Sequence, residues 1–136
     1  MVKKVKKPKT VSKLKKECDM WYSRYRRLSE SYDEYVSCVT CGNRMHWKEA
    51  QNGHYVDRHH NATRFLDKNC HPQCVGCNVF GGGKHDVYAL YLLTRYGADI
   101  LGELNNIKSM GRKFKTYELE AMIKYYKEKV KELLNQ

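Results

Sequence analysis

The chain has 136 residues, a formal net charge of +11 and six cysteines, and its longest apolar stretches are far too short to cross a bilayer. This length suits a single domain with a modest core that a metal ion could reinforce. The N-terminus begins with lysines and lacks the apolar run of a signal peptide, so we expect a cytoplasmic protein with reduced thiols and no membrane association.

The positive charge is concentrated at the N-terminus. Residues 1–27 contain eleven Lys or Arg residues and only two carboxylates, a net charge of +9. Residues 1–9 predict a disordered basic arm, and residues 10–35 predict a basic helix that starts at Thr10 or Ser12. Neutralised phosphates release counterions, so this region favours DNA binding without sequence preference; the alternative is a solvated helix face with a disordered tail. The candidate DNA-binding residues are Lys3, Lys4, Lys6, Lys7, Lys9, Lys13, Lys15, Lys16, Arg24, Arg26, Arg27 and Lys84.

Apolar side chains recur at spacings of three and four residues along the predicted helix and define one stripe. The stripe consists of Leu14, Cys18, Trp21, Tyr25, Leu28 and Tyr32. It predicts a face that packs either on the core of the same chain or on a second copy, and in the second case the protein would be a homodimer. The arginines Arg24, Arg26 and Arg27 lie largely off the stripe and are expected to face water or nucleic acid.

Residues 36–84 have little helical periodicity and predict a metal-binding core with the order knuckle, strand, loop, strand, knuckle. The Cys-x-x-Cys pairs Cys38/Cys41 and Cys74/Cys77 are separated by 32 residues. Two such pairs are typical of a structural zinc site with four thiolate ligands. Two disulfides, or buried thiols that bind nothing, are the alternatives.

Polar residues beside the cysteine pairs form a candidate catalytic site. Hydrolysis of a phosphodiester needs a base and a divalent ion, here Mg²⁺ or Mn²⁺, and histidine is a natural base because its pKa lies near working pH. His54 follows the first pair, Asn69 precedes Cys74 by five residues, and Asn78 follows Cys77 directly. This order resembles the ββα-metal (HNH, or His-Me) nucleases, which implies that His54 is the base, Asn69 orients it and Asn78 binds the ion.

Each of these residues also has a structural interpretation. His54 could be structural, Asn69 could form a turn, and Asn78 could be a helix N-cap. His71 shares a strand face with Asn69 and is equally a metal ligand of the site or a packed histidine.

The residue before the candidate base departs from the HNH pattern. Many HNH enzymes have an aspartate or another ligand there, and this chain has Gly53. The ion therefore lacks one hard oxygen ligand. Asp57 is a candidate replacement, although residues three apart do not share a strand face.

The remainder of the chain predicts a helical part over residues 85–136. Gly81 to Gly83 predict a flexible turn that can approach a phosphate, with Lys84 nearby. A helix is expected over residues 85–96, ending at Gly97, followed by a short helix over 98–104 and a last helix from Thr116. The apolar faces of the first and last of these helices are Val87, Ala89, Leu90 and Leu93, and Leu119, Met122, Ile123, Tyr126, Val130 and Leu133.

Five segments of the chain resemble the NinG (Rap) recombination proteins of lambdoid phages and prophages. They are residues 38–42, 53–55, 63–65, 69–78 and 91–97, and the resemblance extends over about residues 7–134. It implies an α+β fold, in which a small zinc-bound ββα-metal (HNH-like) core is flanked by an N-terminal basic helix and C-terminal helices. It also implies a buried thiol at Cys70, and it makes Gly53 a family trait.

The resemblance implies a structure-selective endonuclease that acts on branched recombination intermediates such as Holliday junctions and D-loops. Its ions would be structural zinc and catalytic Mg²⁺ or Mn²⁺, and its partners branched or duplex DNA and phage recombinase proteins, in the cytoplasm of a bacterial host. The first alternative is a zinc-containing DNA-binding accessory protein that does not cut. The second is a zinc-bound scaffold that uses Trp21 and the last helix to bind a protein partner.

Overall fold

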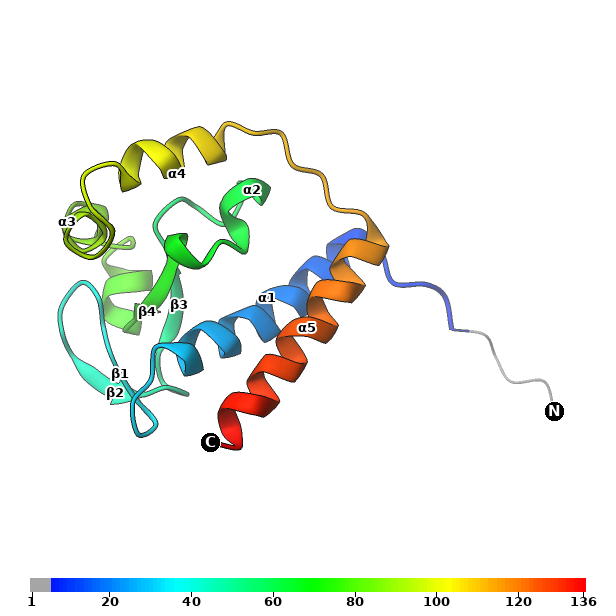
Figure 1. The fold of residues 1–136 in the computed structure, drawn as a ribbon, viewed down its shortest axis with the longest axis horizontal. Helices are drawn as coiled ribbons and strands as arrows, with labels where there is room; N and C mark the ends of the chain where they lie inside the picture. Colours follow the sequence, from blue (N-terminus) through cyan, green and yellow to red (C-terminus); the bar gives the residue numbers. More distant parts are fainter. Residues whose placement is uncertain (1–5) are drawn as a thin grey trace.

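A computed structural model describes residues 6–136, and it combines helices with two small β-hairpins (Figure 1). The α+β mixture predicted from the sequence is therefore confirmed. Lys3 and Lys4 of the basic arm lie outside the described residues. The elements are α1 (Val11–Ser29), β1 (Tyr35–Ser37), β2 (Arg44–His46), β3 (Gln51–His54), α2 (Asn61–Arg64), η1 (Asp67–Asn69), β4 (Cys70–Gln73), η2 (Gly76–Phe80), α3 (His85–Tyr96), α4 (Ile100–Lys108) and α5 (Thr116–Leu134).

Helix α1 begins where the sequence predicts and ends earlier. Thr10 is the N-cap, and its Oγ1 accepts a hydrogen bond from the Lys13 backbone at 3.2 Å. The helix ends at Ser29, and further on Asp33 and Glu34 adopt positive φ angles of 49° and 70°, which a helix continuing to residue 35 cannot contain. The prediction of a helix to residue 35 was therefore wrong.

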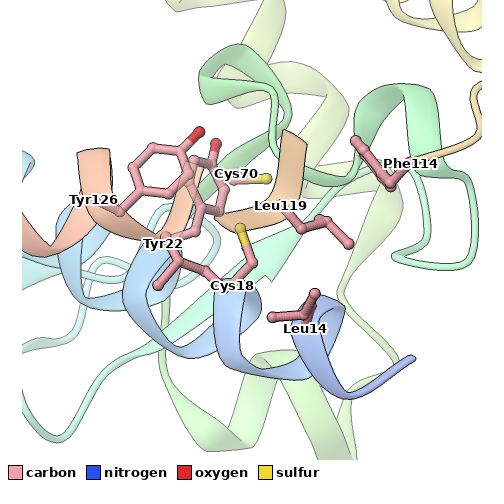
Figure 2. Close-up of a cluster of buried hydrophobic side chains, with 8 residues drawn as sticks. Leu14, Cys18, Tyr22, Cys70, Phe114, Leu119 and Tyr126 are labelled. Carbon is pink, nitrogen blue, oxygen red and sulfur yellow. The ribbon is translucent and has the colours of Figure 1, made fainter. Parts of the chain in front are cut away.

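Helices α1 and α5 lie side by side and share the first apolar cluster (Figures 1 and 2). The cluster consists of Leu14, Cys18, Tyr22, Cys70, Phe114, Leu119, Ile123 and Tyr126. Leu14 and Cys18 confirm the predicted stripe, whereas Trp21 and Tyr25 are only partly buried and Tyr32 is 84% exposed. The stripe packs on α5 of the same chain, so this face of α1 is not available as a dimer seam.

The four strands form two separate antiparallel hairpins. Strand β1 pairs with β2 around the first cysteine pair, and β3 pairs with β4. In the second hairpin His54 lies opposite Cys70, and Gly53 lies opposite His71. Because side chains alternate along a strand, His54 and His71 point to opposite faces of this hairpin. The His54 face meets α1, and the His71 face meets α3.

Helix α3 has the predicted bounds, and Gly97 ends it with a φ of 97°. Its buried face differs from the predicted one, because Val87 and Leu90 are 43% and 64% exposed. The residues that turn inward are Tyr88 and Leu92, which join Ile100 and Leu104 of α4 in a second apolar cluster. Tyr88 turns inward because its hydroxyl bonds with the β3–β4 hairpin, a long-range contact that helical periodicity does not reveal.

Helix α5 confirms the predicted last helix, with Leu119, Ile123, Tyr126 and Val130 buried along one side. Between α4 and α5 the chain crosses the molecule as an extended segment (Figure 1). None of the helices in residues 6–136 combines the length and the apolar composition that a bilayer crossing requires.

Candidate active site and metal-binding cluster

The two Cys-x-x-Cys pairs form a single cluster of four thiols. The sulfur atoms of Cys38, Cys41, Cys74 and Cys77 all lie within 4.8 Å of one another, and those of Cys41 and Cys74 are 3.7 Å apart. Tetrahedral zinc with bonds of about 2.3 Å to four sulfurs requires sulfur separations of about 3.8 Å. All six cysteines of the chain are free thiols. The cluster could therefore bind a metal ion such as zinc.

Backbone hydrogen bonds hold the first cysteine pair against the second hairpin. The Cys38 amide donates to the Asn43 carbonyl at 2.8 Å, and the Gly42 amide donates to the Cys38 carbonyl at 2.8 Å. The Val39 amide donates to the carbonyl of Pro72 in β4 at 3.0 Å. A metal ion in the cluster would therefore join the β1–β2 hairpin to the end of β4.

Cys18 and Cys70 lie outside this cluster, in the apolar cluster between α1 and α5 (Figure 2). Both side chains are fully buried, and burial raises the pKa of each thiol to about 12. They are therefore neutral core thiols, as the sequence predicts.

A cleft of 570 Å³ lies between α1, strand β3 and the segment that follows the second cysteine pair. Three of the predicted catalytic and ion-binding residues line it, His54, Asn78 and Asp57, and so does the predicted DNA-binding residue Arg27. Asn69 and His71 do not line it. Other polar residues that line it include Asp19, Arg27, Gln51, Asn52, Arg58 and His85.

The geometry of His54 fixes which ring nitrogen could act as a base. Its Nε2 lies 2.9 Å from the carbonyl oxygen of Arg64. Because a carbonyl oxygen only accepts, Nε2 carries the proton, and the neutral ring keeps an unprotonated Nδ1. Burial lowers the pKa of His54 below its ordinary value, which favours this neutral form at neutral pH.

Asp19 of α1 holds the segment that orients His54. The Arg64 side chain donates from Nε to one Asp19 carboxylate oxygen at 2.9 Å and from a terminal nitrogen to the other oxygen. A second terminal nitrogen donates to the Arg58 carbonyl at 3.0 Å. Bidentate Arg–carboxylate pairs fix geometry in two directions, so Asp19 positions Arg64 and, through its carbonyl, the His54 ring. This role could not be predicted from residue spacing, because Asp19 lies far from Arg64 along the chain.

Asn69 is a fully buried residue that holds the loop between His54 and Arg64. Its Oδ1 accepts from the Val56 amide at 2.7 Å, and its Nδ2 donates to the carbonyls of Val56 and Thr63 at 3.0 and 3.1 Å. All these contacts are to backbone, and none is to the His54 ring. Any influence of Asn69 on His54 therefore passes through this loop.

Asn78 and Asp57 have different capacities to bind an ion. Asn78 lies within η2 and donates to Gln51 Oε1 at 2.7 Å, which leaves its Oδ1 available as a ligand. It is not a helix N-cap, since its own amide donates to the Cys74 carbonyl within the turn. Asp57 lies at the exposed rim of the cleft, where one carboxylate oxygen accepts from the backbone and the ring of His59.

His85 is a cleft residue that the sequence reasoning did not identify. It is the first residue of α3, and its Nε2 lies 3.0 Å from the Tyr55 carbonyl. Because a carbonyl oxygen only accepts, Nε2 carries a proton, and Nδ1 is the ring nitrogen that could bind an ion. The signal in the sequence is a histidine at the start of the helix directly after the glycine run.

Gly53 has no room for a side chain. A Cβ atom there would lie 1.9 Å from Oε1 of Gln73, which is fully buried in β4. The amide nitrogen of Gln73 is held in place, because Nε2 donates to Thr40 Oγ1 at 3.1 Å and to the Gly83 carbonyl at 3.0 Å. Glycine at position 53 and glutamine at position 73 are therefore sterically matched.

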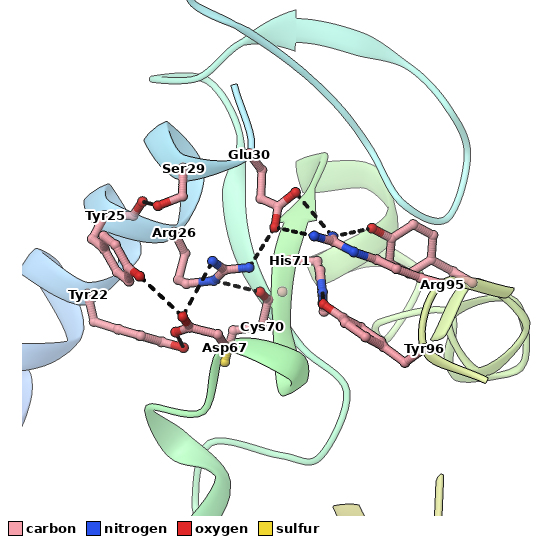
Figure 3. Close-up of polar contacts among 12 residues, drawn as sticks. Tyr22, Tyr25, Arg26, Ser29, Glu30, Asp67, Cys70, His71, Arg95 and Tyr96 are labelled. Carbon is pink, nitrogen blue, oxygen red and sulfur yellow. Dashed lines mark hydrogen bonds and ion pairs between the residues drawn. The ribbon is translucent and has the colours of Figure 1, made fainter. Parts of the chain in front are cut away.

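His71 is a packed histidine, which corrects its prediction as a catalytic residue. It is fully buried, with Nδ1 3.0 Å from the Tyr88 hydroxyl and Nε2 2.7 Å from the Tyr96 hydroxyl (Figure 3). Tyr88 donates its own proton to the Gly53 carbonyl at 2.8 Å, so Nδ1 of His71 is the donor and Nε2 accepts from Tyr96. Burial lowers the pKa of His71 to about 3, and both nitrogens are occupied.

Arg26 is buried, which corrects its prediction as a DNA-binding residue. Its guanidinium donates to the Cys70 carbonyl at 3.1 Å and to Glu30 at 2.8 Å, and it lies 3.8 Å from Asp67 (Figure 3). Arg95 of α3 pairs with the same Glu30, so this cluster joins α1 to α3. Only 5% of Arg26 is exposed, too little to reach a phosphate.

The chain was compared with known proteins. The family model described as bacteriophage lambda NinG protein matches residues 2–136. The chain is 29% identical over 104 residues to protein ninG of Escherichia phage lambda and to protein ninG of Escherichia phage 933W, and 29% identical over 102 residues to protein ninG of Salmonella phage P22.

These alignments cover 76%, 76% and 74% of this chain, and 50%, 51% and 49% of the relatives. The chain thus spans about half the length of the curated relatives that it matches. No solved structure matches. Because the family model covers nearly the whole chain, this protein belongs to the NinG family.

Proposed function

We propose that this protein is a metal-dependent endonuclease that cuts branched DNA, such as Holliday junctions and D-loops, during phage or prophage recombination. The observation that carries the proposal is the orientation of His54. Its Nε2 proton is held by a backbone carbonyl, its pKa is lowered, and its ring lines an open cleft. A neutral imidazole with one fixed nitrogen and one available nitrogen has the form of a general base.

In the proposed reaction, Nδ1 of His54 accepts a proton from a water molecule, and the water oxygen forms a bond to phosphorus. The bond from phosphorus to the 3′ oxygen breaks, which leaves a 5′ phosphate, and the 3′ oxygen takes up a proton from solvent water to become a 3′ hydroxyl. A bound Mg²⁺ or Mn²⁺ would supply stabilisation of charge on the phosphate and on the leaving oxygen. Asn78 Oδ1, His85 and the second carboxylate oxygen of Asp57 are the cleft donors that would hold it.

The same proposal assigns β3, β4 and the turn after Cys77 to a ββα-metal core. Strand β3 carries the base, β4 follows the loop-holding residue Asn69, and the segment from Asn78 to His85 leads into α3. Zinc in the cysteine cluster would fix the start of that segment. Its role is structural, because the four thiols complete a tetrahedron and leave no open position for substrate.

Basic residues beside the cleft support DNA as the substrate. Arg27 and Arg58 line the cleft, and Lys13 and Lys16 lie on the same side of α1 as Arg27 at helical spacing. Arg27 Nη1 donates to the carbonyls of Trp47 and Ala50 at 3.1 and 3.3 Å, so its charge is held in place. We propose that the backbone of DNA follows this side of α1 into the cleft.

Further proposed contacts lie outside this line. Lys6, Lys7 and Lys84 are exposed, Lys15 is partly exposed, Lys9 pairs with Glu17, and Arg24 lies over Trp21. Contacts with a phage recombinase, assembly as a homodimer and a location in the bacterial cytoplasm remain part of the proposal.

The alternative function is a zinc-containing DNA-binding accessory protein that does not cut. One observation favours it: in the described cleft, Asp19 is paired with Arg64 and one oxygen of Asp57 is taken by His59. The cleft therefore offers few hard oxygen ligands for Mg²⁺. Under this alternative, His54→Ala would leave every measurable activity unchanged.

A cleavage assay separates the two functions. Labelled Holliday junction, flap and linear duplex are incubated with Mg²⁺ or Mn²⁺ and with the parent, His54→Ala or His46→Ala. His46 lies on β2, outside the cleft, and serves as the matched control. We expect the parent and His46→Ala to cut branched DNA and His54→Ala to bind it without cutting. Tight binding without cutting by the parent would favour the accessory function.

A further inference from the structure

Two apolar side chains project into solvent directly after the cleft residue Asn78. Val79 is 56% exposed and Phe80 is 85% exposed, among the highest values for large hydrophobic residues in the described chain. Neither side chain belongs to any of the apolar clusters of the fold. An exposed phenylalanine loses apolar stabilisation in the free protein, so its position calls for a binding partner.

The backbone around Phe80 is held by several hydrogen bonds. The amides of Gly81 and Gly83 donate to the carbonyls of Gly76 and Cys77 at 2.8 and 2.9 Å. This return of the chain requires positive φ angles at Gly82 (64°), Gly83 (88°) and Lys84 (49°). This turn, residues 79–84, is called the tip below. Its hydrogen bonds anchor it on the second cysteine pair, so it is not the flexible turn expected from its glycines.

The tip also forms one border of the cleft. Asn78 on one side of Phe80 and Gly82 and Gly83 on the other side all line the cleft that contains His54. Lys84 is exposed at the end of the same turn. Phe80 thus lies in a turn between residues that line the proposed cutting site, and Lys84 is four residues further along the chain.

We propose that Phe80 stacks on an unpaired or unstacked base at a DNA branch point, while the adjacent cleft receives the phosphate. The inference rests on the proposed function for the identity of the phosphate site, and it names the feature of branched DNA that the protein recognises. Linear duplex keeps its bases stacked in pairs, so a ring at this position gains a partner only where the stack is open.

The chemistry around Phe80 favours a base over a protein partner. A stable protein interface buries about 800 Å² on each side with a continuous apolar centre. Here the segment from Val75 to Lys84 exposes three large apolar residues, Val75, Val79 and Phe80, and it ends with the exposed Lys84. A small aromatic tip that ends with a cation matches the stacking and phosphate contacts of single-stranded nucleic acid.

The test uses the full chain and a four-way junction with 2-aminopurine at the branch point. Ca²⁺ replaces Mg²⁺ so that binding is measured before any cutting. The parent should raise the 2-aminopurine emission, because the base leaves its stack, and Phe80→Ala should not. Phe80→Ala should weaken junction binding by about tenfold and change duplex binding by less than about twofold, as expected for one lost stacking contact. Phe80→Trp should restore the affinity for the junction, because its ring can stack in the same way.

Tyr117→Ala is the matched control, because Tyr117 is 64% exposed on α5 and does not line the cleft. Unchanged zinc content in Phe80→Ala verifies that the tip keeps its anchor. The inference is overturned if Phe80→Ala raises the emission as the parent does, if Tyr117→Ala loses as much affinity, or if the parent binds no branched DNA.

Cleavage with Mg²⁺ is scored separately, so the two proposals fail in different ways. An emission change that needs Phe80, without any cutting, would support the stacking and contradict the endonuclease. The opposite outcome is cutting that needs His54, together with an emission change that is the same in the parent and in Phe80→Ala. It would contradict the stacking and support the endonuclease.

Discussion

The β3–β4 hairpin carries a histidine on each face, and the two side chains lie in opposite environments. His54 has Nε2 bonded to the Arg64 carbonyl, in a ring that lines the cleft. His71 is sealed between Tyr88 and Tyr96, and both nitrogens are used. Two histidines on one hairpin thus differ in burial and in the partners that the fold gives them.

The largest expected effect concerns the cysteine cluster at the end of the β3–β4 hairpin, which carries the His54 face and the His71 face. Removal of zinc with a chelator, or Cys74→Ser, should abolish the cooperative thermal transition, since structural zinc contributes about 10 kcal/mol or more of apparent binding free energy. Metal analysis of the parent should give about one zinc per chain. The Cys70→Ser variant is the control, because it changes a cysteine outside the cluster and should keep the zinc. An unchanged transition in Cys74→Ser would remove the basis for a metal-held fold.

The second prediction is that alanine at one histidine lowers the cleavage rate, whereas alanine at the other lowers the stability of the fold. His54→Ala should lower the cleavage rate by about 10²-fold to 10⁴-fold, the usual contribution of a general base. His71→Ala should lower the free energy of unfolding by about 2 to 4 kcal/mol, because it leaves a cavity and unpaired tyrosine hydroxyls. Denaturant melts and single-turnover cleavage on the same preparations measure both. The comparison fails if His71→Ala, once folded, loses as much activity as His54→Ala.

The third prediction concerns the match between Gly53 and Gln73. Gly53→Ala should cost about 1 to 3 kcal/mol of unfolding free energy, because the new Cβ would overlap Gln73 Oε1. The double variant Gly53→Ala/Gln73→Ala should lose less than the sum of the single variants, since truncation of Gln73 removes the clash. Strict additivity in urea melts would show that the two positions are independent.

The fourth prediction is a pH dependence that belongs to the His71 face. The folded pKa of His71 is about 3, below its unfolded value, so the unfolded state binds more protons at mildly acid pH. The resulting stability is present above about pH 6.5 and declines as the pH falls toward the folded pKa, by about 2 kcal/mol between pH 7 and pH 5. The positive charges of Arg26 and Arg95 lower the pKa of His71, and the negative charge of Glu30 raises it. The charges of these arginines do not change in this pH window. His71→Phe should flatten this slope in urea melts, and an unchanged slope would contradict the assignment.

The smallest expected effect concerns Asp19, which positions His54 through Arg64. Asp19→Asn should lower the cleavage rate by about tenfold, because the amide keeps the shape and weakens the charged pair. Affinity for DNA should change little, and the pH profile of cleavage should shift, which a purely structural residue would not cause. Glu17→Gln is the control on the same helix. Equal rates in Asp19→Asn and the parent would show that Arg64 needs no partner.

Local patterns predicted the parts of the molecule that depend on near neighbours in the sequence. The α5 stripe, the bounds of α3 and the cysteine cluster follow from helical period and Cys-x-x-Cys spacing. The early end of α1 could not be predicted, because Asp33 and Glu34 adopt positive φ without glycine.

Long-range contacts account for the remaining differences. Arg26 and His71 are buried polar residues, and their hydrogen-bond partners lie on elements that are distant in the sequence. Asp19 and His85 reach the cleft only because α1 and the start of α3 meet beside β3. Spacing identified His54, Asn78 and Asp57 as cleft residues, and it could not reveal which nitrogen of His54 is held.

The most direct test of the central assignment is rescue of His54→Ala by added imidazole in the branched-DNA cleavage assay. If His54 acts as a base through one free nitrogen, imidazole should restore cutting in proportion to its neutral form, and it should have no such effect on Asn78→Ala. Cutting by His54→Ala at the parental rate without imidazole would contradict the assignment of His54 as the base.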